Sequence, residues 1–244
     1  MKRLAIGVLA IWGLAASGAI AGSTAPAEPA LPPTAATASA GAAAATPAPV
    51  VPKLSNFADL VVAGIVGENA PLLAVDFASG IALGAQPLVL EKTTLSEIKA
   101  LMGGTSHSQG DPGSAVSWLC YTRHAATKAD TPRTVWFIST SPSAPDAIDM
   151  VVVENVDATK VSGCLTAPKT FVFPSFAIPG IGASLADVKG KFGALVRDRQ
   201  HNVYYNSARP LNDGSGRSVY QKLGYRLNKK GVVSGIALSQ VTTD

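Results

Sequence analysis

The amino-acid sequence predicts an α+β fold of two tandem units, each a short helix packed on about three antiparallel strands. The first observation is a repeated decapeptide, TLSEIKALMG at residues 94–103 and SLADVKGKFG at residues 184–193. The second is that each copy precedes runs rich in valine, isoleucine and aromatic residues, which favour strands. The third is that helices this short do not persist alone, so each one needs a sheet to lie on.

Both copies of the decapeptide carry the start and stop signals of a helix. Thr94 and Ser184 are the predicted N-caps, and Glu97 completes a Thr-x-x-Glu capping box in the first copy. Gly103 and Gly193 are the predicted terminators. The apolar residues follow at spacings of three and four, which places them on one helical face: Leu95, Ile98 and Met102, and then Leu185, Val188 and Phe192.

The strands expected after each helix are separated by Ser, Pro, Gly and Asp. They are residues 116–122, 134–139 and 148–154 after the first helix, and residues 203–205, 218–228 and 232–241 after the second. The turn Asn-Lys-Lys-Gly at 228–231 predicts a hairpin between the last two strands. The sequence therefore predicts two copies of a unit made of one helix and about three strands.

Residues 1–21 have the pattern of a secretory signal peptide. Lys2 and Arg3 precede an apolar run, and Ala19-Ile20-Ala21 supplies the small-x-small cleavage pattern. The alternative is an uncleaved N-terminal membrane anchor, because the apolar run is nearly long enough to span a bilayer. We expect a periplasmic or secreted protein with no membrane-spanning segment after cleavage.

The remaining chain divides by composition into a linker and two folded units. Residues 22–52 are rich in Ala and Pro, which predicts a disordered, semi-rigid linker. Residues 53–174 are expected to form the first α+β unit with an N-terminal extension, and residues 175–244 the second. Whether residues 53–92 belong to the first unit is left open.

The two predicted units differ in charge. Residues 53–174 hold eight Lys/Arg against eleven Asp/Glu, a net charge of −3, whereas residues 175–244 hold ten against four, a net charge of +6. One interpretation is an ordinary surface whose halves happen to differ. The other is that the basic half faces an acidic protein or an anionic lipid or cell-wall surface. Nucleic acid is not expected, because aromatic residues do not cluster among the basic ones of this exported chain.

Two cysteines, Cys120 and Cys164, are present in the whole sequence. In an exported chain an isolated pair predicts a disulfide. The alternative, a catalytic thiol, requires a neighbouring base, and the sequence offers none.

The sequence contains no pattern that identifies a catalytic, metal or cofactor site. The histidines, His107, His124 and His201, lack the spacing of metal ligands. Ser106-His107-Ser108 lies in a glycine-rich stretch without a Gly-x-Ser-x-Gly motif. Residues 213–218, Asp-Gly-Ser-Gly-Arg-Ser, are interpreted as a hairpin loop and not as a phosphate cradle. Asp146 with Asp149 offers no paired-acid arrangement.

A set of tyrosines and arginines in the second unit is the candidate interface, because both residue types are enriched at the energetic centres of protein interfaces. Its members are Tyr204, Tyr205, Tyr220, Tyr225, Arg197, Arg199, Arg209, Arg217 and Arg226. The alternative is that the tyrosines fill the core.

The pattern resembles a known family. A capped helix reading Ser/Thr-Leu-x-x-Val/Ile, a glycine, aromatic-rich strands, a glycine turn and a last apolar strand are similar to the β-lactamase-inhibitory-protein-like superfamily, which includes small lipoproteins of outer-membrane assembly. The resemblance rests on 94–103 with 118–153 and on 184–193 with 203–241. It implies a sheet used to bind other proteins. Unlike the assembly lipoproteins, this chain has no cysteine for lipidation.

These observations predict an exported binding module without a cofactor, an envelope accessory or inhibitor-like protein that contacts a protein or an anionic polymer through its basic second unit. They predict no enzymatic activity. The alternatives are a small envelope hydrolase with an unrecognised site, favoured by a deep pocket that brings a histidine and a carboxylate together, and a structural domain that serves mainly to display the linker.

Overall fold

The computed structural model describes residues 54–62, 70–111, 114–125, 131–156, 161, 163–193, 197 and 202–243. The predicted signal peptide at 1–21 and the predicted linker at 22–52 lie outside the described residues. So do Arg199 and His201 of the candidate residues. All described residues belong to one unit, Ala48–Asp244.

Short helices separate groups of strands along the described chain. In order they are α1 (Asn56–Val62), β1 (Leu72–Leu73), β2 (Ala82–Leu83), β3 (Gln86–Pro87), α2 (Leu95–Met102), β4 (His107–Gln109), β5 (Val116–Arg123), β6 (Arg133–Ser139), β7 (Met150–Glu154), β8 (Leu165–Thr166), α3 (Leu185–Phe192), β9 (Asn202–Pro210), β10 (Ser218–Leu227) and β11 (Val233–Thr243).

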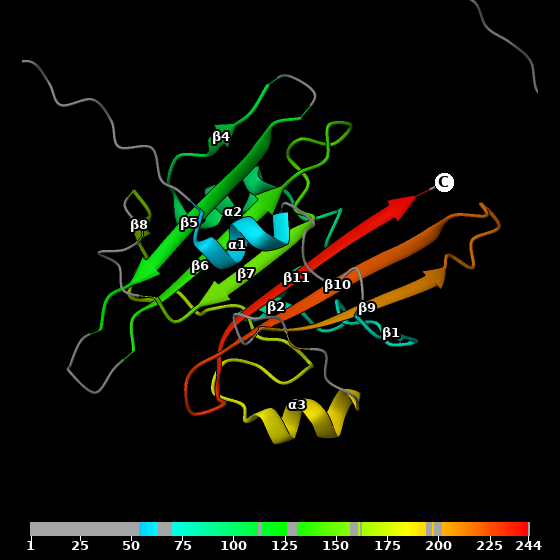
Figure 1. Ribbon diagram of the computed structural model, residues 1–244. Helices are drawn as coiled ribbons and strands as arrows, with labels where there is room; N and C mark the ends of the chain where they lie inside the picture. Colours follow the sequence, from blue (N-terminus) through cyan, green and yellow to red (C-terminus); the bar gives the residue numbers. More distant parts are fainter. Residues whose placement is uncertain are drawn as a thin grey trace, which may run out of the picture. The chain divides into compact units, whose positions relative to one another are not determined.

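One nine-stranded mixed sheet dominates the described part of the molecule (Figure 1). Its strand order is β1-β9-β10-β11-β7-β6-β5-β4, with β8 added beside β5. The pairs β1–β9 and β5–β8 are parallel, and the others are antiparallel. Strands β2 and β3 form a separate small ribbon.

The predicted fold class, an α+β fold of two tandem units, is wrong. The molecule is mostly β, and its helices have seven or eight residues each in the chain that is described. The strands after the two predicted helices do not make separate sheets, because β7 pairs with β11 from Met150–Ser239 to Glu154–Gly235. Strand β7 is the last strand of the meander β5-β6-β7, and β11 is the last strand of the meander β9-β10-β11. Their pairing covers an exposed edge of each meander, and local helix and strand signals do not predict such a long-range pairing.

The two predicted helices themselves begin and end where the caps indicated. Thr94 Oγ1 accepts a hydrogen bond from the Glu97 backbone N–H at 3.1 Å, and Glu97 accepts one from the Thr94 N–H at 2.7 Å. Ser184 and Asp187 form a second capping box, which the sequence analysis did not anticipate. Gly103 and Gly193 close the helices, as predicted.

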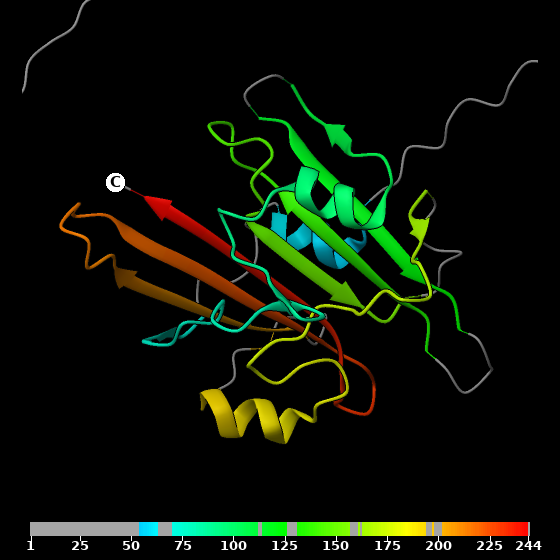
Figure 2. The same cartoon turned by 180° about the vertical axis from the view of Figure 1, so that it is seen from behind.

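The sheet buries apolar side chains on both of its faces. On the side that we call the α2 face, strand side chains such as Leu119, Val135 and Val151 pack with residues of α2 and α3. The opposite side, the α1 face, buries Trp118 and Trp136 together with α1. Figures 1 and 2 show α1 and α2 on opposite sides of the sheet.

The predicted disulfide between Cys120 and Cys164 is confirmed. Cys120 lies on β5 and points into the α1 face, and Cys164 comes immediately before β8. The bond therefore fixes the segment that brings β8 alongside β5. None of the described helices has the length and apolar character required to span a bilayer.

Candidate functional site

Three of the four candidate interface tyrosines are buried. Tyr205 and Tyr225 lie in the core of the α2 face beside Phe192. Burial raises the pKa of Tyr205 to about 12 and raises that of Tyr225 further. Tyr204 is buried on the α1 face, whereas Tyr220 is 49% exposed. The tyrosines mainly fill the core, which was the alternative interpretation.

The candidate arginines are distributed over different parts of the sheet. Arg209 donates to Asp76 at 2.7 Å on the α2 face, and Arg217 donates to Asp213 at 3.2 Å within the loop between β9 and β10. Arg226 pairs with Glu154. Since Arg226 alternates with the core residue Tyr225 along β10, its side chain belongs to the α1 face. Arg197 is exposed. The candidate residues therefore do not form one surface, and their role in binding stays a prediction.

A row of polar side chains crosses the α2 face where the apolar core ends. Gln221 on β10 lies opposite Gln240 on β11 and opposite Ser207 on β9. The Gln240 backbone N–H donates to the Asp149 carbonyl at 2.8 Å, which extends the row to the residue before β7. Two residues away along the strands, the same positions hold Leu223, Leu238, Tyr205 and Val151, which are all buried.

A groove of about 910 Å³ lies at this end of the α2 face. Residues from the stretches 76–81 and 87–92 line it together with the end of β11. The loop between β6 and β7 lies at one end and the loop between β9 and β10 at the other. The larger apolar residues of its lining are Ile81, Leu88, Val89, Leu90, Leu211, Val219 and Val241. The volume is within the range of small-ligand sites.

The side chain of Glu91 is held in the groove by three hydrogen bonds. Its carboxylate accepts from the Thr242 N–H and hydroxyl, both at 2.6 Å, and from the Gln240 amide at 2.9 Å. Glu91 has a φ of 63°, the one positive value outside glycine among the described residues. A non-glycine residue in this region is strained, and such strain concentrates at functional sites.

The network continues from Gln240 to the other end of the groove. The Gln221 amide donates to Gln240 at 2.8 Å and to Asp76 at 2.7 Å, and its carbonyl accepts from the Phe77 N–H at 2.8 Å. Asp76 in turn accepts from Arg209. Side chains from five separate stretches of sequence are thus locked in one arrangement before any ligand arrives.

Asp149 differs from the other acidic groups of the groove because half of its carboxylate has no partner. The side chain is 5% exposed, and Oδ2 accepts from the Thr140 N–H at 2.8 Å and the Thr140 hydroxyl at 2.6 Å. Oδ1 is buried and receives no hydrogen bond from the described residues. Burial raises the pKa of Asp149, and the charge on Glu91 raises it further. The hydrogen bonds from Thr140 and from the backbone N–H of Asp149 act in the opposite direction.

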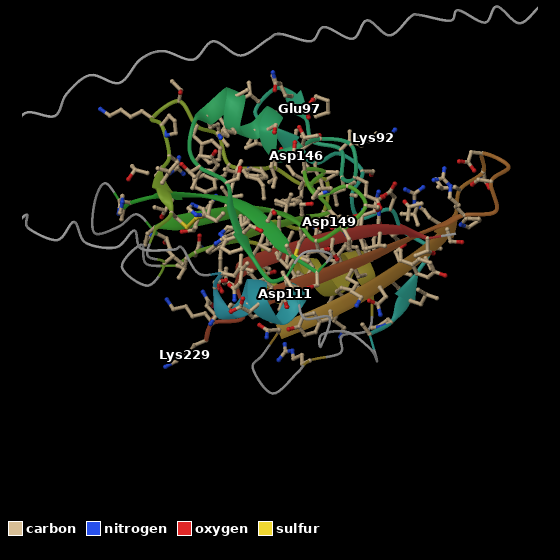
Figure 3. The ribbon with its side chains drawn as sticks, turned by 90° about the horizontal axis from the view of Figure 1, so that it is seen from above. Lys92, Glu97, Asp111, Asp146, Asp149 and Lys229 are labelled. Atoms are coloured by element: carbon tan, nitrogen blue, oxygen red, sulfur yellow. A yellow bond between two sulfur atoms is a disulfide. The ribbon has the colours of Figure 1, made fainter. Side chains whose placement is uncertain are left out.

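No cation is bound to the carboxylates of Glu91 or Asp149 among the described residues. The salt bridges of that part of the chain involve Arg209, Arg217 and Arg226. Lys92 also lines the groove, but it is exposed. Figure 3 shows Asp149 beside the C-terminal strand β11 and Lys92 farther out. This corner is therefore a site of negative charge with an open acceptor.

The remaining candidate residues lie outside the groove. His107 on β4 is beside Trp118, where burial lowers its pKa, and His124 is within 3.5 Å of Thr166. No described histidine lines the groove. No cluster of three or more metal-ligating side chains occurs in the described part of the chain.

Comparison with protein-family models, with curated proteins and with solved structures finds no match to this chain. The resemblance to the β-lactamase-inhibitory-protein-like superfamily therefore stays a prediction.

The sequence analysis did not identify Glu91, Gln240 or Asp149 as groove residues. A signal was available in the strand periodicity. Gln221 interrupts the inward series of Val219, Leu223 and Tyr225, and Gln240 follows Ile236 and Leu238 at the same spacing of two. A buried polar residue within an inward apolar series requires a partner, so each one marks a position where the core is interrupted.

Proposed function

We propose that this chain is a binding protein that holds its ligand in the groove on the α2 face. The observation that carries this proposal is the carboxylate of Asp149, buried in the lining of a preformed groove with Oδ1 open. Several buried polar atoms of the described residues lack a partner, each at a cost of about 1–3 kcal/mol, and among them Asp149 Oδ1 and Arg209 Nε belong to residues that line the groove. A ligand donor on Oδ1 removes that penalty.

The arginines of the basic stretch favour a peptide over an anionic polymer as the occupant of the groove. Arg209 and Arg217 line the groove, but each already donates to an aspartate. A polyanion that binds through both guanidiniums has to compete with Asp76 and Asp213. A ligand with a single carboxylate can use the unpaired Arg209 Nε instead, so a peptide is preferred over an anionic cell-wall or lipid surface as the partner.

Export to the periplasm or the exterior is part of the proposal. The signal-like residues 1–21 and the Cys120–Cys164 disulfide support it, because disulfides persist in oxidising compartments. Sequencing the N-terminus of the protein recovered from its native host tests this. A start near residue 22 supports export, and an intact Met1 contradicts cleavage.

The groove is tested by blocking it with a large side chain. Ser143 is exposed and lines the groove, so Ser143→Trp fills its space without entering the core. Ser96 is exposed on α2 and outside the groove lining, so Ser96→Trp is the matched control. We expect a screen of peptides, amines, sugars and phosphates by thermal shift to give a saturable stabilisation of the native chain and of Ser96→Trp, absent in Ser143→Trp. Equal shifts in all three proteins, or none in any, overturn the proposal.

The second candidate is a small envelope hydrolase, favoured by the raised pKa of Asp149 next to the carboxylate of Glu91. Two carboxyl groups in unlike environments are a common acid–base arrangement. The two functions are separated by incubating the ligand found in the screen with the protein and measuring product by mass spectrometry. Product that forms with the native chain and not with Asp149→Asn supports the hydrolase, and unchanged ligand supports the binding protein.

A further inference from the structure

The two ends of the groove carry an unpaired hydrogen-bond acceptor and an unpaired hydrogen-bond donor. At the end near β7, Asp149 Oδ1 is an open acceptor in a corner that also holds Glu91. At the end near β9, Arg209 Nε is a buried donor that no described residue accepts from, although Arg209 also donates to Asp76 through NH2. A ligand that satisfies both ends must carry a donor at one terminus and an acceptor at the other.

The separation of these ends follows from the sheet. Asp149 precedes β7, and Arg209 lies on β9, with β11 and β10 between them. Three strand spacings of about 4.8 Å, with an offset of two residues along the strands, place the two backbones ~16 Å apart. An extended peptide advances ~3.3–3.6 Å per residue, so roughly four or five residues fill this span.

The groove lining selects among ligands of that length. Its described lining residues include no aromatic side chain, so a sugar ring or a nucleobase finds no platform on which to stack. Aliphatic side chains such as Leu88, Leu90 and Val241 suit small apolar groups instead. The charge at the Asp149 end favours a cationic donor over a neutral one, because Glu91 and Asp149 bind no cation of the described chain.

We propose that the groove binds a short peptide in extended form, with its N-terminal ammonium on Asp149 and its C-terminal carboxylate on Arg209. This rests on the proposed function, since it assigns the ligand of the same groove. The peptide lies across β11 and β10, over Gln240 and Val219. Its recognition depends on two free termini, so it is a cleaved peptide and not an internal segment of a protein.

The test is calorimetric titration of the full chain with tetra-alanine in four forms: free, N-acetylated, C-amidated, and blocked at both ends. A charge-assisted hydrogen bond lost at either end weakens binding by roughly tenfold or more. We therefore expect the free peptide to bind most tightly, each singly blocked form to lose about that factor, and the doubly blocked form to lose both.

Two variants assign each terminus to its residue. Asp149→Asn should weaken the free and C-amidated peptides roughly tenfold and leave the N-acetylated peptide unchanged. Arg209→Lys removes Nε but keeps a cation beside Asp76, so it should weaken the free and N-acetylated peptides and leave the C-amidated peptide unchanged. A native unfolding midpoint for each variant shows that the loss does not come from misfolding.

Several outcomes overturn the peptide assignment. N-acetylated peptide that binds the native chain as tightly as free peptide contradicts the role of Asp149. C-amidated peptide that binds as tightly as free peptide contradicts the role of Arg209 and indicates the N-terminus of a longer chain. If peptides fail but another class gives a shift that Ser143→Trp abolishes, the peptide inference is wrong and the proposed function stands. If no class gives such a shift, both fail.

Discussion

Strand β7 has a buried carboxylate at each end, and the two carboxylates have different partners. Glu154, its last residue, is 1% exposed on the α1 face and pairs with the guanidinium of Arg226. Asp149, the residue before its first, is 5% exposed on the α2 face and is bonded only through Oδ2, by Thr140. Each carboxylate keeps one buried oxygen without a partner among the described residues, so the difference between them is the cation, which Glu154 has and Asp149 lacks.

The difference separates a structural from a functional carboxylate. A buried charge that is paired within the chain joins neighbouring strands, as Arg226 on β10 and Glu154 on β7 do across β11. A buried charge that no cation of the described chain meets lowers stability, and a cationic ligand group removes that cost. The α1 face, with its disulfide, its tryptophans and this ion pair, is closed, whereas the α2 face opens into the groove.

The largest effect on the free energy of unfolding is expected from removing the Cys120–Cys164 disulfide on the α1 face. Cys120 and Cys164 are 44 positions apart, and closure of a loop of that length contributes about 4 kcal/mol in the chain-entropy model. Replacing both cysteines by alanine should lower the free energy of unfolding by that order, measured by denaturant titration. Ligand binding in the groove should persist under native conditions, because the bond lies on the other face. A loss below 1 kcal/mol would contradict the stabilising role.

The helices were predictable because their signals are local. Thr94 with Glu97 and Ser184 with Asp187 lie within four residues of each other, so sequence alone defines each helix start. The disulfide followed from cysteine number and export. The joining of both meanders into one sheet was not predictable in this way, since it depends on β7 recognising β11 about 85 residues later, a contact set by packing over the whole sheet.

The groove was harder to predict than the fold. The polar residues of the groove and of its hydrogen-bond network come from positions 76, 91, 149, 209, 221 and 240, which are far apart in the sequence. They meet only when β7, β11, β10 and β9 take their register. The sequence analysis also weighted tyrosine and arginine by their general enrichment in interfaces. Tyr205 follows Val203, and Tyr225 follows Leu223, at the strand spacing of two, and this alternation directs both into the core.

The second-largest effect on the free energy of unfolding is expected from replacing Arg226. Arg226→Met leaves the buried charge of Glu154 without its cation, and it should lower the free energy of unfolding by about 2 kcal/mol, less than for a fully buried pair because Arg226 is 45% exposed. Adding Glu154→Gln should restore part of the loss. Arg217→Met is the matched control, since its ion pair with Asp213 is exposed on both sides and should give no measurable change. Equal losses for the two arginines would contradict the distinction.

The smallest effect is expected at Asp149, and its sign is opposite. Asp149→Asn keeps an oxygen for Thr140 and removes a buried charge, so it should raise the free energy of unfolding at neutral pH by less than the loss caused by Arg226→Met. The folded-state pKa of Asp149 is raised above its ordinary value of 3.8, so the native chain is favoured by the protonated form. That contribution is complete below pH 3.8 and is lost as the pH rises through the raised pKa.

The gain of Asp149→Asn over the native chain should therefore be absent below pH 3.8 and appear as the pH rises, in denaturant titrations of both proteins at matched pH values. Comparison at the same pH cancels the titration of groups that the two proteins share, Glu91 and Lys92 included. A structural carboxylate predicts the reverse, a loss at neutral pH like that of Arg226→Met. A gain in stability combined with a loss of peptide binding is the signature of a residue retained for its ligand, because such residues are the ones whose removal stabilises the fold.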